Sequence, residues 1–101
     1  MTFAEWKIEG ERKFGSDTAK WAFECPACHF VQTVEMCRAA GVPEASIGFS
    51  CIGRWSGAKR EAFTPKQTNG PCNYAGGGLF RINPVRVEFP DGMVMDAFAF
   101  A

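Results

Sequence analysis

The sequence carries no excess of charge of either sign. Eleven lysines and arginines balance eleven aspartates and glutamates, so the formal net charge is zero at pH 7. A chain without net charge has no overall field to draw it onto phosphate backbones or anionic lipid. The composition therefore disfavours a general nucleic-acid or membrane-surface protein, although residues 54–82 are locally basic and the residues after them are acidic.

Long apolar runs are also absent. No stretch approaches the roughly 18 consecutive apolar residues that a membrane-spanning helix needs. Residues 1–6 show neither the basic start nor the apolar block of a signal peptide. We therefore expect a cytoplasmic protein with no membrane partner.

No internal repeat divides the chain. Its 101 residues are 47% hydrophobic and 22% charged, which is the ordinary range of a folded globular protein. We predict one domain over residues 1–101; the oligomeric state is not predictable.

Histidine is scarce in this chain, but cysteine is not, with one histidine and five cysteines. An odd number of cysteines in a reducing compartment disfavours disulfides and favours metal binding. Cys25 and Cys28 form a Cys-x-x-Cys turn, and Cys51 and Cys72 each lie within two residues of a turn-forming glycine or proline. We predict that these four thiols bind one zinc ion as part of the fold.

Cys37 and His29 leave alternatives open. Cys37 lies within a helical pattern, where a buried core thiol is the favoured interpretation. His29 is adjacent to Cys28, so it is expected to cap the turn, but either His29 or Cys37 could replace one of the four ligands. A nucleophilic pair, in which His29 activates Cys37 or Cys51, is the enzymatic alternative to our prediction of a non-enzymatic protein.

Hydrophobic periodicity predicts an α+β fold made mostly of antiparallel strands. Strands are expected over residues 3–9, 20–24 and 46–51. One short helix is expected over about residues 34–40, between an N-cap at Thr33 and the stop signal Gly41-Val42-Pro43.

A C-terminal hairpin is the clearest local prediction. Residues 85–89 and 93–100 flank Pro90-Asp91-Gly92, which is typical turn chemistry. Pairing Phe89 with Met93 places Arg86 opposite Asp96 and gives one core face. The residues of that face are Val85, Val87, Phe89, Met93, Met95 and Ala97. Phe98 and Phe100 point to the other side, so either a second layer covers them or they form an exposed apolar edge.

The long connection over residues 54–78 combines basic and aromatic residues. Cations that neutralise phosphate and rings that stack on bases are typical of single-stranded nucleic-acid binding. The alternative is a solvated loop whose rings turn inward, which the zero net charge favours. The candidate partner-binding residues are Arg54, Trp55, Lys59, Arg60, Lys66 and Tyr74.

Cys25-Pro26-Ala27-Cys28 resembles the knuckle of rubredoxin-like and zinc-ribbon proteins, in which glycine often follows the second cysteine; here His29 follows it. The resemblance implies a small zinc-ribbon-like domain. The same four-thiolate site holding iron would imply a rubredoxin-like electron carrier. The opening Phe23-Glu24-Cys25-Pro26-Ala27-Cys28 is also similar to that of small uncharacterised bacterial and bacteriophage proteins, which implies a phage or prophage accessory role.

The leading functional hypothesis is a non-enzymatic zinc-binding interaction module, an adaptor or inhibitor of a protein partner. It would bind that partner through residues 54–78 or through the edge formed by Phe98 and Phe100. Single-stranded nucleic-acid binding through the same loop is the first alternative, and electron transfer is the second.

Overall fold

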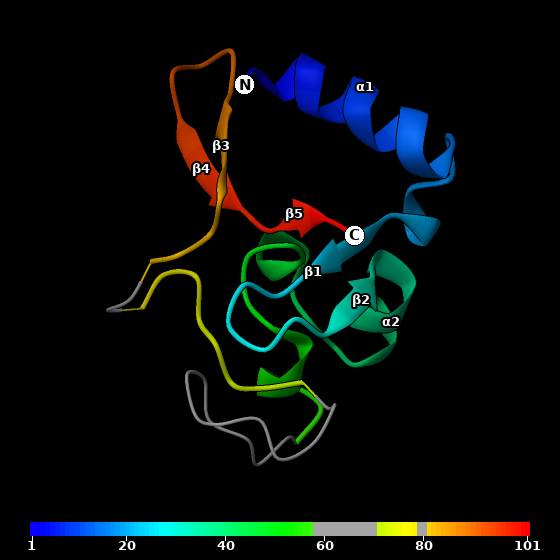
Figure 1. Ribbon diagram of the computed structural model, residues 1–101, viewed down its shortest axis with the longest axis vertical. Helices are drawn as coiled ribbons and strands as arrows, with labels where there is room; N and C mark the ends of the chain where they lie inside the picture. The colour runs from blue at the N-terminus through cyan, green and yellow to red at the C-terminus, as the bar shows by residue number, and fades with distance from the viewer. Residues whose placement is uncertain (58–70, 79–80) are drawn as a thin grey trace.

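The computed structural model describes residues 1–57, 71–78 and 81–101, and it confirms the α+β class (Figure 1). The helices are α1 (Phe3–Phe14) and α2 (Val34–Ala39), with the 3-10 turns η1 (Thr18–Lys20), η2 (Glu44–Ser46) and η3 (Ile52–Arg54). The strands are β1 (Ala22–Glu24), β2 (Val31–Thr33), β3 (Val85–Glu88), β4 (Val94–Ala97) and β5 (Ala99–Phe100). In these ranges, no helix has the length and apolar character needed to cross a membrane.

Helix α1 replaces the strand predicted over residues 3–9, so the prediction of one short helix was wrong. Thr2 and Glu5 form a capping box: the Glu5 N–H donates to Thr2 Oγ1 at 3.1 Å, and the Thr2 N–H donates to Glu5 Oε1 at 2.8 Å. Phe3, Trp6 and Phe14 recur at a helical spacing. Ile8, which fitted an alternating strand, is 65% exposed.

Strand β1 is the centre of a three-stranded antiparallel sheet. It pairs with β2 on one side and with β5 on the other, so Phe23 lies between Gln32 and Phe100. The prediction of a strand over residues 20–24 is thus confirmed in its second half. Because β5 comes from the C-terminus, it joins the hairpin to this sheet (Figure 1).

Helix α2 has the predicted caps. Thr33 Oγ1 accepts a hydrogen bond from the Met36 N–H at 3.1 Å. Gly41 takes a left-handed conformation with φ of 84°, and the Val42 N–H donates to the Cys37 carbonyl at 3.0 Å. Val42 therefore folds back onto the end of the helix and is buried there beside Cys37.

The β3–β4 hairpin has the predicted register, with Arg86 opposite Asp96 and Val87 opposite Met95. The Phe89 N–H donates to the Met93 carbonyl at 2.8 Å, next to a turn in which Gly92 has φ of 90°. The predicted core face holds for Val87, which is 3% exposed, but not for Met93, which is 66% exposed. Met93 follows the turn residue Gly92 directly and precedes the first residue of β4.

The strand predicted over residues 46–51 is wrong. The Ser46 carbonyl instead accepts hydrogen bonds from the Phe49 and Ser50 amides, at 3.1 and 3.0 Å, and closes a turn. Gly48 has φ of 72° within it, a conformation that an extended strand does not use. The alternation of apolar residues here reflects a buried turn.

Phe98 and Phe100 are covered by a second layer, which confirms the first of the two predicted alternatives. The other alternative, an exposed apolar edge that binds a partner, is wrong. Phe98 is 0% exposed and lies 6.1 Å from the Tyr74 ring. Phe100 stacks on Trp6 and Phe23, with centroids 5.3 Å away in both cases. Helix α1 supplies the Trp6 ring, which sequence periodicity had placed on a strand.

Candidate metal centre

Three separate parts of the chain bring four cysteines together. Cys25 and Cys28 lie on the turn between β1 and β2, where the His29 N–H donates to the Cys25 carbonyl at 2.8 Å. Cys51 directly precedes η3, and its amide donates to the Tyr74 carbonyl at 2.9 Å, which fixes it beside the segment that carries Cys72. The four sulfur atoms lie within 4.8 Å of one another, and all four residues are buried.

The spacing of the sulfur atoms matches a tetrahedral metal site. Cys25 Sγ lies 3.9 Å from Cys72 Sγ, and Cys28 Sγ lies 3.8 Å from Cys51 Sγ. Zinc–thiolate bonds of about 2.3 Å give a tetrahedron whose edges are about 3.8 Å. The four thiols could therefore hold a metal ion with little movement.

Backbone amides surround the sulfur atoms. The Tyr74 N–H donates to Cys72 Sγ at 3.4 Å. The Cys28 amide donates in the same way to the Cys25 thiol. The Phe30 amide donates to the Cys28 thiol, and the Gly53 amide donates to the Cys51 thiol. Such donors stabilise thiolates, the form in which cysteine binds a metal.

The clustered thiols do not ionise together. Hydrogen bonds with the neighbouring thiols, Cys25 first, hold the pKa of Cys28 well below its usual range. Hydrogen bonds with the same group of thiols, Cys28 first, raise the pKa of Cys25 far above its usual range. Adjacent negative charges repel one another in a buried site, and a divalent cation removes that conflict.

Gln32 supports the cluster and was missed by the sequence analysis. Its side chain is fully buried, and its Oε1 accepts a hydrogen bond from the Ile52 N–H at 2.8 Å. Its Nε2 lies 3.8 Å from Cys51 Sγ, to which it donates. A glutamine in a three-residue strand gives no local signal of this role, apart from its polar side chain beside the predicted knuckle.

Cys37 and His29 both lie outside the group of four. Cys37 is fully buried and donates to Gln32 Oε1 at 3.9 Å. Burial, followed by the nearby charge of Cys51, raises the pKa of the Cys37 thiol to about 11, so it is protonated at neutral pH. His29 is an exposed residue with φ of 63°, and its Nδ1 lies 3.6 Å from Glu24 Oε1. It occupies the left-handed position at which the resembling knuckles often have glycine.

The predicted partner-binding residues are only partly described. Arg54 is exposed, donates to the Asn73 carbonyl at 3.1 Å and lies 5.9 Å from the Trp55 ring. Tyr74 is 2% exposed, and its hydroxyl accepts from the Ile82 N–H at 3.1 Å, so its ring is not available for stacking on a base. Lys59, Arg60 and Lys66 lie outside the described residues.

Comparison with known proteins identifies a family for this chain. No curated protein and no solved structure matches the chain. The model of the VVA0879-like family matches residues 2–101, a range that contains all four clustered cysteines. Because that match covers nearly the whole sequence, the chain belongs to the VVA0879-like family.

Proposed function

We propose that this protein is a small non-enzymatic module whose fold is held by one structural zinc ion. The ligands would be Cys25, Cys28, Cys51 and Cys72. The observation that carries the proposal is the tetrahedral spacing of four buried thiols. Catalytic zinc sites keep one position open for water or substrate, whereas structural sites are closed by four protein ligands. Four sulfur ligands would close this site.

A metal here would tie together segments that are far apart in the sequence. The Cys25–Cys28 turn, the start of η3 and the segment around Cys72 meet at this cluster and its adjacent core. Structural zinc contributes apparent binding free energy on the order of 10 kcal/mol. That is comparable to the whole free energy of unfolding of a small domain, roughly 5–15 kcal/mol.

Metal removal tests this proposal. A strong zinc chelator is expected to abolish the near-UV circular dichroism of the tryptophans, because Trp21 immediately precedes β1, which leads into the knuckle. Added zinc should restore the signal, and added magnesium, which prefers oxygen ligands, should not. A metal-free protein that keeps this signal and unfolds cooperatively would refute the proposal.

The module would act by binding a protein partner, as an adaptor or inhibitor. Met93 supports this role, because it is 66% exposed on the hairpin and lines the same hollow as Met95 and Phe49. Exposed apolar patches of this kind are typical of interaction sites. Retention of a partner by the metal-loaded protein, and its loss on chelation, would be the expected result of a pull-down.

Electron transfer is the second candidate, because iron also suits four thiolates at this spacing. The backbone amides that donate to the sulfur atoms favour it, since such hydrogen bonds tune the reduction potential of iron–thiolate centres. A visible absorption band in the purified protein would support iron. A colourless protein that contains zinc would exclude this candidate.

A further inference from the structure

The outer edge of β4 can be identified from the hydrogen bonds of its neighbour β3. The Met1 amino group donates to the Arg86 carbonyl at 2.9 Å, and the Glu88 N–H donates to the Met1 carbonyl at 2.8 Å. The backbone groups of Arg86 and Glu88 therefore face away from β4. Arg86 pairs with Asp96, and Glu88 pairs with Val94. In an antiparallel ladder, two paired residues both point their backbone N–H and C=O groups toward each other or both point them away. The backbone groups of Asp96 and Val94 therefore face away from β3.

This outer edge is only partly occupied. The Asp96 carbonyl accepts a hydrogen bond from Asn83 Nδ2 at 2.9 Å. Across the described residues, the amide and carbonyl of Val94 and the amide of Asp96 have no hydrogen-bond partner on the outward side. An edge with unpaired N–H and C=O groups can accept a further strand.

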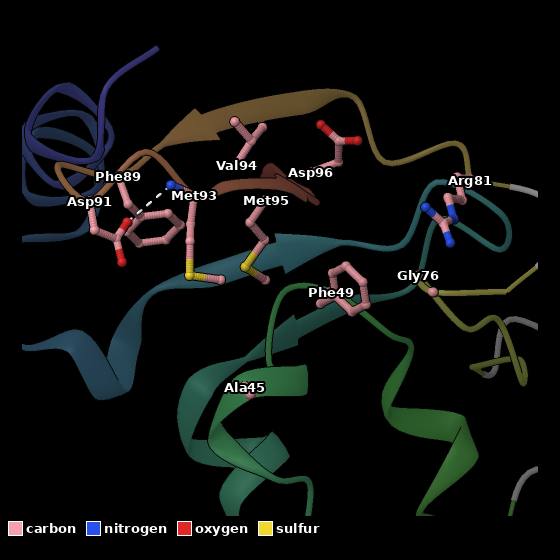
Figure 2. A pocket seen from close by; sticks show the side chains of 11 residues that line it. Ala45, Phe49, Gly76, Arg81, Phe89, Asp91, Met93, Val94, Met95 and Asp96 are labelled. Atoms are coloured by element: carbon pink, nitrogen blue, oxygen red, sulfur yellow. Dashed lines mark hydrogen bonds between the residues drawn. The ribbon is translucent and has the colours of Figure 1, made fainter.

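A hollow of about 550 Å³ runs along the same edge (Figure 2). Its lining includes residues from both faces of β4. Figure 2 shows Met93 and Met95 pointing to one side, where Phe49 lies, and Val94 and Asp96 pointing to the other. A strand added here would alternate its side chains between an apolar side and a polar side.

The charges around the hollow are unequal. Asp91 and Asp96 contribute two carboxylates, and Arg81 contributes one guanidinium. Asp96 is exposed on the side of β4 opposite Met95. Arg86, which pairs with it on β3, places its guanidinium 3.8 Å from the Glu88 carboxylate. A residue paired with Asp96 would lie beside its carboxylate, where a basic side chain is favourable and an acidic one is not.

We propose that an extended segment of a partner protein, with alternating apolar and basic residues, adds to β4 as a further strand. This rests on the proposed function, because it names the partner class of the interaction module. The apolar residues contact Met93, Met95 and Phe49, and the basic residues lie beside Asp96. A second copy of this chain fits less well, because its β4 would bring its own Asp91 and Asp96 to an acidic edge.

The test uses the metal-loaded full chain and three synthetic peptides in calorimetric titration. The first peptide is Val-Lys-Val-Lys-Val-Lys with blocked ends. The second has the same composition in the order Val-Val-Val-Lys-Lys-Lys, and the third has glutamate in place of lysine. We expect the alternating basic peptide to bind at least tenfold more tightly than either control. Equal binding of the first two peptides, or no binding of the first, would overturn the proposal.

Two matched variants locate the site. Val94→Pro removes the outward amide and leaves the β3–β4 hydrogen bonds in place, because proline is tolerated where the N–H faces away from the ladder. Val94→Thr keeps both the shape and the amide. We expect Val94→Pro to weaken peptide binding at least tenfold and Val94→Thr to change it less than twofold. Equal binding by both variants, with cross-strand NMR contacts intact, would contradict the proposed edge.

Metal content and sedimentation separate the remaining outcomes. A protein that holds one zinc ion and binds none of the peptides refutes this inference and leaves the structural zinc standing. A protein that holds no metal refutes the proposed function itself. Dimerisation of the wild type that Val94→Pro abolishes would show that a second copy fills the edge, which overturns the choice of a partner protein.

Discussion

Two cysteines in this core have the same burial and different surroundings. Cys51 and Cys37 are both 0% exposed, but only Cys51 lies within 4.8 Å of three other thiols. Cys37 meets the amide oxygen of Gln32 instead. Burial alone therefore does not distinguish a candidate ligand from a core thiol; the neighbouring sulfur atoms do.

Alanine at each of these positions tests that distinction. Cys51→Ala is expected to lower zinc affinity on the order of 100-fold or more, because one of four ligands is lost. Cys37→Ala should keep one zinc per chain and cost about 1 kcal/mol of stability through a small cavity. Metal analysis of both purified variants checks this, and loss of zinc from Cys37→Ala alone would contradict the assignment.

Gln32 is expected to contribute more to the stability of the fold than to the number of zinc ions bound by each chain. Gln32→Met would leave the buried Ile52 amide without its acceptor, at a cost of about 1–3 kcal/mol in the free energy of unfolding. Urea unfolding of the zinc-loaded protein measures this cost.

Gln32→Glu is the matched control, because it keeps the acceptor but adds a carboxylate close to Cys51. It should weaken zinc retention more than Gln32→Met does; the reverse order would argue against the hydrogen bonds described here.

The four clustered cysteines could be predicted from the sequence because each of them carries a local signal. Cys25 and Cys28 are separated by two residues, Cys72 follows Pro71 directly, and Gly53 lies two positions after Cys51. Gln32 could not be found in that way. Its role depends on β2 bringing it against the amide of Ile52, twenty residues further along the chain.

At the scale of elements, helix α1 depends on a close approach to Trp21. Gly10 is the one buried residue of α1, and a Cβ atom there would overlap the Trp21 ring. Glycine in the middle of this helix therefore lets the Trp21 ring pack directly against the helix backbone. Glycine nevertheless disfavours a helix by about 1 kcal/mol relative to alanine.

Gly10→Ala is expected to destabilise the protein in spite of its better helix propensity. Displacing the Trp21 ring should cost about 1–3 kcal/mol, as overpacking of a core does. Ile8→Ala is the control on the same helix, because Ile8 is 65% exposed and its removal should change stability by less than about 0.5 kcal/mol. Urea unfolding checks both variants, and a stabilised Gly10→Ala protein would show that α1 does not pack as described.

Elements with a clear local signal were predicted correctly, and elements whose apolar pattern fits more than one structure were not. The β3–β4 register follows from the turn chemistry of residues 90–92 and from opposite charges, both of which are local signals. Residues 3–9 fit both an alternating pattern and a helical one, and the capping box of Thr2 and Glu5 decides between them. In residues 46–51 the alternation is overridden by the left-handed conformation of Gly48, which no pattern of apolar residues reveals.

At the scale of the whole molecule, the cysteine cluster and the hydrophobic core are one structure. The buried core includes all four thiols together with Trp21, Phe23, Tyr74 and Phe98. Figure 1 shows α1 and the β3–β4 hairpin on one side of β1 and β5, with β2 and α2 on the other. Loss of the metal should therefore destabilise the whole fold rather than one loop.

Native mass spectrometry of the purified protein tests the central claim most directly, because it counts and identifies the metal bound to each intact chain. We expect one zinc ion per chain, lost together with the compact charge-state distribution on acidification or chelation. Iron in its place would favour electron transfer over a structural role. A compact chain that carries no metal after growth in zinc-supplemented medium would contradict the account.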